Sequence, residues 1–129
     1  MNTSTPTIIF SVYRAEISAG LNAMAVSRAK AVLKKRGIPY FKAIGCYKGQ
    51  QEPAFVLQDV ADNLAIVQKL ATWYKQESIL LIDANRQARL ETVDGELIES
   101  LGQFRETRKG IAEQRDSWTE CHGRYWIAA

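Results

Sequence analysis

A lone carboxylate raises the first chemical question in this chain. Residues 45–59 are GCYKGQQEPAFVLQD, and Glu52 stands directly before Pro53 at the start of an apolar run. Acids before proline are common in turns, so a purely structural role is one interpretation of Glu52. No His or Asp stands beside Glu52 to form an acid–base pair. A functional role for Glu52 would therefore be electrostatic rather than proton transfer.

A conventional catalytic set is missing from the sequence. His122 is the only histidine, and the glycine after it favours a turn. Cys46 and Cys121 have no CxxC spacing, so we predict structural thiols and no metal site. Neither a dinucleotide-binding glycine pattern nor a Walker sequence occurs. The polar residues at expected strand ends and loops are Ser11, Tyr13, Arg14, Tyr40, Tyr47, Glu52 and Gln76. None is a strong nucleophile, so an enzyme built on them must need little proton transfer.

Size and composition predict a single domain over residues 1–129, with 1–6 as a flexible N-terminus. Hydrophobic residues are 47% of the chain, enough for a sizeable core. The net charge of +3 comes from 17 basic and 14 acidic residues that we interpret as scattered, so no nucleic-acid partner is predicted. The sequence has no apolar run of about 18 residues and no charged segment before its first short apolar run. We therefore expect no membrane span, no secretory signal, and a cytosolic protein.

Hydrophobic periodicity predicts the order β-α-β-β-α-β in the first part of the chain. Strands are expected at 7–15, 40–47, 54–60 and 78–83, and helices at 20–35 and 62–74. Gly37 is expected to end the first helix, and Asp62 to cap the second. This order is that of an α+β, ferredoxin-like βαββαβ sandwich, with both helices on one face of an antiparallel sheet.

Further strands are expected beyond this unit. They lie at 87–93, 102–107 and 118–127, and the last is broken at His122 and Gly123. We interpret them as C-terminal β additions to the sandwich. A four-stranded sheet with helices on one side leaves its other face bare, and an added segment or another subunit must cover it. The bare face predicts an oligomer.

Several short pieces of the chain, taken in order, carry a family resemblance. They are Ser11-Val12-Tyr13-Arg14, Gly45-Cys46-Tyr47, Glu52 before a strand, residues 73–77 (WYKQE) before SILLID, and residues 102–104 (GQF) and 123–126 (GRYW). Together they resemble the coliphage S-adenosylmethionine hydrolases, better called lyases, over most of the chain. The chain departs from that family in a shorter loop between Tyr47 and Glu52. Where the family has an acidic pair, residues 51–52 keep only the second acid.

The resemblance implies cleavage of S-adenosylmethionine to methylthioadenosine and homoserine lactone. The substrate's own carboxylate attacks its γ-carbon and a neutral thioether leaves, so no general base is required. Positioning alone can contribute roughly 7–11 kcal/mol in the best cases. The resemblance also implies a homotrimer similar to the PII signalling proteins, with active sites between subunits and no cofactor besides the substrate. It places the protein in the host bacterial cytoplasm, where substrate depletion would disarm restriction systems that require S-adenosylmethionine.

Roles at the site follow from the same resemblance. Glu52 is expected to hold the cationic ammonium and sulfonium region. Tyr47 and Tyr40 are expected either to hydrogen-bond the substrate tail or stack near the adenine, or to be packed strand tyrosines. Substrate-binding roles are assigned to Ser11, Val12, Tyr13, Arg14, Tyr40 and Gln76. The three tryptophans, Trp73, Trp118 and Trp126, are interpreted as core or interface residues.

Three alternatives stay open on the sequence. A hydrolase would let water attack the same carbon and give homoserine directly. A PII-like trimer could bind an adenine nucleotide or S-adenosylmethionine without turnover. A host protein, such as the synthetase that makes S-adenosylmethionine, could also be a partner.

Overall fold

The computed structural model describes residues 5–58 and 60–129, which form eight strands and three helices. The strands are β1 (Thr7–Phe10), β2 (Phe41–Tyr47), β3 (Gln50–Gln58), β4 (Ser78–Ile82), β5 (Gln87–Thr92), β6 (Leu97–Thr107), β7 (Trp118–Cys121) and β8 (Arg124–Ala128). The helices are α1 (Ala19–Lys35), α2 (Val60–Trp73) and α3 (Lys109–Ala112). Of the predicted flexible segment, residues 1–4 lie outside the described part.

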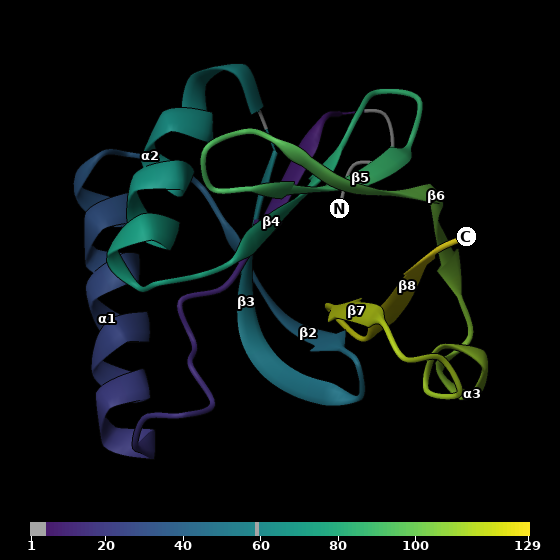
Figure 1. Cartoon of the computed structure of the whole chain (residues 1–129), viewed down its shortest axis with the longest axis horizontal. Coiled ribbons are helices and arrows are strands. Elements are labelled where there is room, and N and C mark those ends of the chain that lie inside the picture. Colours follow the sequence, from purple (N-terminus) through teal and green to yellow (C-terminus); the bar gives the residue numbers. More distant parts are fainter. Residues whose placement is uncertain (1–4, 59) are drawn as a thin grey trace.

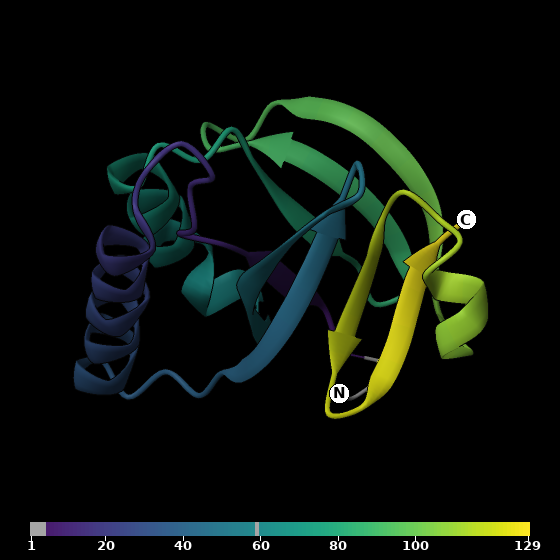
Figure 2. The same cartoon turned by 90° about the horizontal axis from the view of Figure 1, so that it is seen from below.

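All strand pairs are antiparallel, and they close into a barrel in the order β1-β3-β2-β7-β8-β6-β5-β4. Helices α1 and α2 lie together on one side of this barrel (Figure 1). The β7–β8 hairpin and the short α3 lie on the opposite side, as the view from below shows (Figure 2).

The prediction of a ferredoxin-like βαββαβ sandwich is wrong. The strands interpreted as C-terminal additions continue the sheet from β4 and close it against β2. The face expected to be bare is the interior of this barrel and is filled by the chain's own side chains. The argument from a bare face to an oligomer therefore no longer holds, and the PII-like sheet arrangement implied by the resemblance is wrong for this closed barrel.

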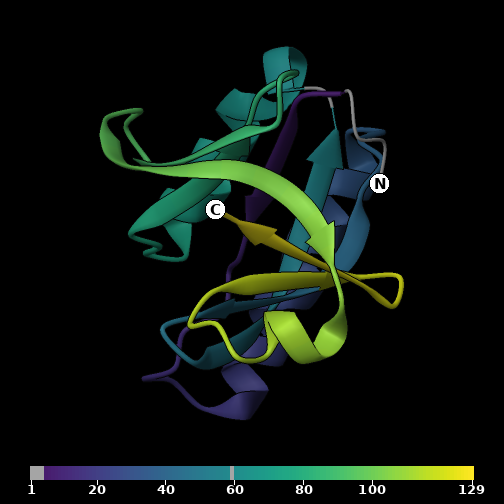
Figure 3. The ribbon, with the colours of Figure 1, turned by 90° about the vertical axis from the view of Figure 1, so that its right-hand side faces the viewer.

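Strand β6 closes the barrel by pairing with two neighbouring strands. Its first half pairs with β5 and its last four residues pair with β8, and the long strand arches over the barrel in Figure 3. Two register shifts interrupt the β5–β6 ladder, and such irregularities bend a strand and increase its twist. Gly102, at the bend, has φ +94, and a Cβ there would meet the backbone of Ala129 at 2.5 Å. Only glycine fits this position without displacing the backbone.

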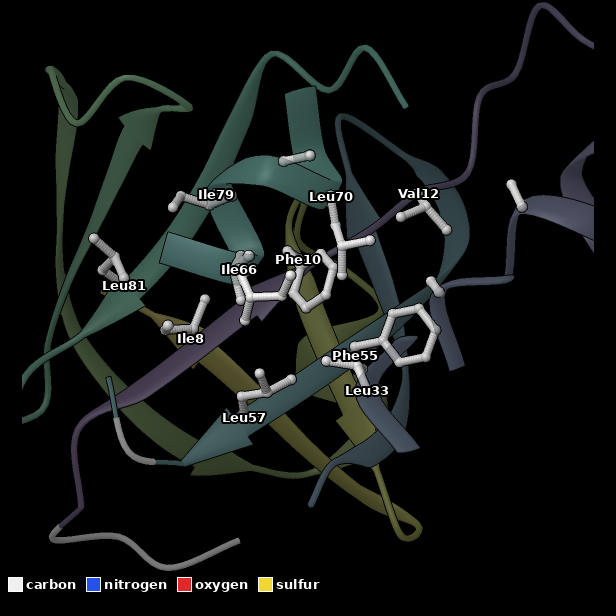
Figure 4. Packing of buried hydrophobic residues seen from close by; sticks show 14 residues of the cluster. Ile8, Phe10, Val12, Leu33, Phe55, Leu57, Ile66, Leu70, Ile79 and Leu81 are labelled. Carbon is white, nitrogen blue, oxygen red and sulfur yellow. The ribbon is translucent and has the colours of Figure 1, made fainter. Parts of the chain in front are cut away.

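Strands β1 and β4 and the second half of β3 are largely buried on both faces because they lie between the helices and the barrel interior. Alternate residues point to opposite faces. Thus Ile8 and Phe10 face an outer core beneath the helices, while Ile9 faces an inner core within the barrel. Figure 4 shows the outer core, in which Phe10, Leu33, Phe55 and Leu70 converge from β1, α1, β3 and α2.

The inner core contains a layered stack of aromatic rings and one guanidinium. Phe104 of β6 and Trp126 of β8 are parallel within 1°, with centroids 5.5 Å apart. The Arg86 guanidinium carbon lies 5.4 Å from the Phe104 ring centroid and 6.0 Å from that of Trp126. Burial lowers the pKa of Arg86, and Asp83 partly opposes this. The prediction that Trp118 and Trp126 are buried is confirmed, whereas Trp73 is 64% exposed on α2.

Helix α1 ends where its sequence predicts and begins one residue before the predicted start. Ser18 is the N-cap, and its side chain accepts a hydrogen bond from the Leu21 backbone N–H at 3.2 Å. Gly37 follows the helix with φ +68, and the Ile38 N–H donates back to the Leu33 carbonyl at 2.9 Å. This pattern is that of a Schellman ending, so the predicted glycine stop is confirmed.

Several predicted boundaries are wrong, including the start of β6 at Leu97 rather than at residue 102, and two of them matter for the site. Strand β1 ends at Phe10 rather than at residue 15, since the chain leaves the ladder at Ser11. Strand β3 begins at Gln50 rather than at residue 54, so Glu52 lies within a strand and not in a loop. Helix α2 begins at Val60, which puts Asp62 in its first turn instead of at its cap.

Candidate active site at the mouth of the barrel

A cavity of about 420 Å³ opens at one end of the barrel, within the usual size range of small-molecule sites. The ends of β1 and β2 and the starts of β3, β4 and β7 meet there, because neighbouring strands are antiparallel. The cavity brings together six of the eight predicted site residues: Ser11, Tyr13, Arg14, Tyr47, Glu52 and Gln76.

The other two predicted site residues do not line this cavity. Val12 is fully buried in the outer core beneath the helices. Tyr40 packs its ring edge-to-face against Phe55, with centroids 5.4 Å apart, on the same outer side. Both side chains therefore serve the packing of α1 and α2 against the sheet.

Glu52 points into the mouth of the barrel. It lies two and four residues before Ala54 and Val56, which belong to the inner core, so all three share the inward face of β3. Its partner across the ladder is Gly45, whose missing side chain leaves room for the carboxyl group. Burial raises the pKa of the Glu52 carboxyl, and a hydrogen bond with Ser11 partly lowers it. Glu52 is thus a carboxylate with little stabilisation from the protein itself.

Ser11 anchors the chain where β1 ends. Its hydroxyl donates to the Pro53 carbonyl at 2.8 Å and accepts from the Tyr13 N–H at 2.9 Å. A serine hydroxyl has one hydrogen, so the donation to Pro53 competes with a donation to Glu52. The Ser11 side chain can therefore hold the loop and exchange between the two acceptors.

Gln76 binds the same loop from the other side of the mouth. Its Nε2 donates to the Tyr13 carbonyl at 2.9 Å and to the Tyr74 carbonyl at 3.3 Å. Because both neighbours are carbonyl oxygens, the amide nitrogen must face them. Both amide hydrogens are then used within the protein. Gln76 can offer a ligand only its Oε1, which is a hydrogen-bond acceptor.

Asn22 is a site-positioning residue that the sequence analysis missed. It is 4% exposed in the first turn of α1. Its Oδ1 accepts from the Arg14 N–H at 2.8 Å and its Nδ2 donates to the Arg14 carbonyl at 2.7 Å. Ser11, Asn22 and Gln76 therefore fix the backbone of the loop after β1, which has no strand partner of its own.

The rim of the cavity carries three acids and two bases. Glu16, Glu52 and Glu77 face Arg14 and Lys75. Arg14 is already paired, since its Nε lies 2.7 Å from the Glu16 Oε1. Tyr47 is 48% exposed at the rim. The acids are thus in excess, which favours a cationic ligand.

The described residues offer no ready metal site. Within residues 5–58 and 60–129, no group of three or more His, Cys, Asp or Glu side chains is placed to hold a metal ion. His122 has φ +54 in the turn between β7 and β8, as its sequence predicts. Cys46 and Cys121 are both buried, and burial raises the pKa of each thiol. None of the helices in the described part is long and apolar enough to cross a membrane.

Comparison with protein-family models decides the family. The model of the S-adenosylmethionine lyase family matches residues 8–129, which include every residue that lines the cavity. The chain belongs to the S-adenosylmethionine lyase family. A comparison with curated protein sequences finds no match. Membership of this lyase family implies S-adenosylmethionine as the substrate, a cation that suits the acidic rim.

The apolar walls of this lyase-family cavity were also missed on the sequence. They come from Leu80, Leu90, Leu101, Phe104, Trp118 and Trp126. These side chains are contributed by β4 to β8 and meet only because the barrel closes. No local spacing in the sequence could have grouped them. These apolar walls, which we call the floor of the cavity, lie beneath a charged rim, as is typical of small-molecule sites.

We expect Asn22→Ala to destabilise the protein by about 2–4 kcal/mol, since each backbone group left unpaired away from water costs about 1–3 kcal/mol. Loss of this contact frees the loop that carries Tyr13 and Arg14, so KM should rise several-fold more than kcat falls. Urea unfolding and steady-state kinetics would measure both. The exposed Asn85→Ala is the control and should change neither quantity. An unchanged KM in folded Asn22→Ala would contradict a role in positioning the site.

Proposed function

We propose that this chain is an S-adenosylmethionine lyase that forms methylthioadenosine and homoserine lactone. A carboxylate oxygen of the substrate forms a bond to its γ-carbon, while the bond from that carbon to sulfur breaks. The electron pair goes to sulfur, so the sulfonium becomes a neutral thioether. No proton moves and no water is activated. The observation that carries this proposal is a family-matched cavity whose inward carboxylate, Glu52, has no acid–base partner.

Glu52 would bind the ammonium group of the methionine tail. Its charge also attracts the sulfonium, but that charge disappears during reaction, so attraction to it stabilises the ground state more than the transition state. The ammonium keeps its charge throughout, and a contact to it holds the tail without opposing the chemistry. The Oε1 of Gln76, as an acceptor, suits the same ammonium.

The remaining groups of the rim would position the methionine tail and leave its carboxylate free. Arg14 is engaged with Glu16, which leaves the substrate carboxylate unpaired and able to attack. Tyr47 would hydrogen-bond the tail from the rim, and Ser11 and Tyr13 would contact it through the loop after β1. The adenine would lie against the apolar floor formed by Trp118 and its neighbours. Val12 and Tyr40 would then contribute only through packing.

A hydrolase is the second candidate, and one observation favours it. Burial raises the pKa of Glu52, and a carboxylate with a raised pKa is a better general base for water. In that mechanism Glu52 would take a proton from a water that attacks the γ-carbon. The two mechanisms differ in the origin of the γ-oxygen of the product.

The test is to incubate purified protein with S-adenosylmethionine in ¹⁸O-water and to follow products by chromatography, proton NMR and mass spectrometry. The lyase gives methylthioadenosine with transient lactone. When that lactone opens at its carbonyl, ¹⁸O enters the carboxyl group of homoserine. The hydrolase instead places ¹⁸O in the γ-hydroxyl from the first time point. Absence of methylthioadenosine would overturn both and leave a binding protein without turnover.

Assembly and biology are proposed from the family resemblance alone. A homotrimer would place cavity mouths near subunit boundaries, and light scattering during gel filtration would test it. In a host bacterial cytoplasm, a phage lyase would deplete S-adenosylmethionine and disarm restriction systems that need it. A host protein such as the S-adenosylmethionine synthetase is a proposed partner, which a pull-down with the purified synthetase would test.

A further inference from the structure

The charges of this chain are not scattered, contrary to the sequence analysis. Residues 17–51 hold seven of the 17 Lys and Arg residues and none of the 14 Asp and Glu residues. The other 94 residues hold ten basic and fourteen acidic side chains. The modest net charge of +3 therefore conceals a strongly basic segment within an acidic remainder. This segment contains α1, which forms one outer side of the molecule in Figure 2.

The cations of α1 form two rows on either side of an outward ridge of small residues. Ala23, Ser27 and Ala31 are exposed and spaced four apart, so they lie one above the other on the outward face, which they share with the 48% exposed Met24. One row is Arg28 and Lys35, and the other is Lys30 and Lys34, which extends to Lys42 on β2.

Contacts confirm that the rows lie on opposite sides of the helix. Arg28 lines a shallow groove with Val32, Trp73 and Tyr74, so its row faces α2. Lys30 interacts with Lys42, so the other row faces β2, and this like-charged neighbour lowers the pKa of Lys30. The two rows therefore flank the ridge of small residues.

Counter-ions for these rows are missing from the described part of the chain. Its ion pairs are Arg14–Glu16, Arg89–Glu91, Lys109–Glu113 and Arg124–Glu106, none of which involves α1 or β2. Two lysines in contact without an anion between them repel each other. An external anion bound between them would lower this repulsive energy.

We propose that this face of α1 binds the backbone of double-stranded DNA without sequence preference. An α-helix with its side chains is about 10–12 Å across, and the major groove of B-DNA is about 12 Å wide. The face between the rows, on which Met24 is the one large side chain, allows the helix to enter, and a row of cations on each side then meets the phosphates of one strand. Between the rows, only Ser27 and the apolar Met24 could reach the base edges, so most contacts are to phosphates and do not read sequence.

The same geometry predicts that this face prefers duplex DNA to other polyanions. The major groove of double-stranded RNA is deep and narrow, so α1 cannot enter it. An acidic protein surface would satisfy the charges, but it does not require two rows separated by the width of a helix. The proposal therefore predicts a preference for duplex DNA over duplex RNA of the same sequence.

Fluorescence anisotropy with a labelled DNA duplex of about 20 base pairs tests the proposal. The binding constant should fall with salt, with a log–log slope of about −3 to −4 for four phosphate contacts, at about −0.9 each. The triple variant Arg28→Gln, Lys34→Gln, Lys35→Gln should bind at least about tenfold more weakly, with a shallower slope. Its turnover of S-adenosylmethionine should be unchanged, because these residues lie outside the cavity.

A charge-matched control shows whether the loss of DNA affinity comes from this surface of α1 or only from the lower net charge of the protein. The triple variant Arg105→Gln, Arg108→Gln, Arg115→Gln removes as much charge from exposed positions elsewhere, and its DNA affinity should stay within about twofold of the parent protein. An equal loss in both triple variants would overturn the proposal, as would RNA binding as tight as DNA binding. No binding of duplex DNA at low salt would also overturn it. Binding of a polyglutamate peptide to α1 would then assign the face to an acidic protein. Each outcome is independent of whether the cavity turns over S-adenosylmethionine.

Discussion

Replacing Glu52 by Gln is expected to lower kcat/KM for S-adenosylmethionine by about 10- to 100-fold, mostly through a higher KM. A hydrogen bond to a charged group contributes about 1.5–3 kcal/mol, and the variant keeps the shape of the side chain but loses its charge. Because the ammonium contact is present in both ground and transition states, affinity should suffer more than kcat. Steady-state release of methylthioadenosine measures both parameters.

The same substitution should stabilise the free protein at neutral pH. Burial raises the pKa of Glu52, so the folded state favours the protonated carboxyl more than the unfolded state does. This contribution to stability is present below the unfolded pKa and is lost as the pH rises through the folded pKa. Glu52→Gln has no carboxyl group to ionise at this position, so its stability does not fall in this way as the pH rises. Its advantage in urea unfolding should therefore be greatest near pH 7 and should disappear as the pH falls below about 4, near the unfolded pKa.

The exposed Glu99→Gln is the matched control. It removes the same charge from β6, where we expect a stability change within about 0.5 kcal/mol and unchanged kinetics. Activity of the parent protein should decline at acidic pH as Glu52 is protonated, and Glu52→Gln should lack this titration. If Glu52→Gln kept the parental kcat and KM, the electrostatic role of Glu52 would be wrong. A hydrolase that uses Glu52 as a base would instead show a collapse of kcat at an unchanged KM.

Local structure was largely predictable because it depends on local signals. The helix at 20–35 follows from its periodic apolar residues, and its end follows from Gly37 before Pro39. The strand at 78–83 follows from a continuous apolar run between polar segments, and β4 covers Ser78–Ile82. The end of β1 was missed because side-chain hydrogen bonds of Ser11, rather than any strand-breaking residue, take the chain out of the ladder. The start of β3 was missed because β3 pairs with β2 from Gln50 onward, before its apolar run begins.

Closure of the barrel was not predictable from these signals. The order β-α-β-β-α-β fits a sandwich as well as one wall of a barrel. What distinguishes the two is the course of β6, which bends at Gly102 and joins β5 to β8. The pairing of β6 with β8 depends on contacts between Phe104 and Trp126, which are 22 residues apart in the sequence.

The polar rim of the site could be predicted, whereas its floor could not. Ser11 follows β1, Glu52 lies near the start of β3 and Gln76 precedes β4, and the structure places all three on one cavity. Asn22 gave only a weak signal, a buried asparagine within a helix, where asparagine is unfavourable unless its side chain has partners. The aromatic floor becomes visible only in the closed barrel.

Trp126→Ala is expected to destabilise the protein by about 3–5 kcal/mol, the usual cost of truncating a buried tryptophan. Trp126 is 3% exposed, is stacked on Phe104 and is covered by Arg86. The change would empty the inner core where β8 pairs with β6. Urea unfolding measures this loss, and a higher KM for S-adenosylmethionine should accompany it, because Trp126 also lines the cavity.

Two further variants show whether this loss reflects the stacked ring. Trp73→Ala is the same substitution at a tryptophan that is 64% exposed, so it should cost less than about 1 kcal/mol. Trp126→Phe keeps a ring against Phe104 and removes an indole N–H that is buried without a hydrogen-bond partner in the described part of the chain. We expect it to retain most of the stability, within about 1.5 kcal/mol. If Trp126→Ala cost no more than Trp73→Ala, the inner core would not hold β8 against β6. The cavity would then need another source for its floor, because Leu101, Phe104 and Trp126 form one wall only while these two strands are paired.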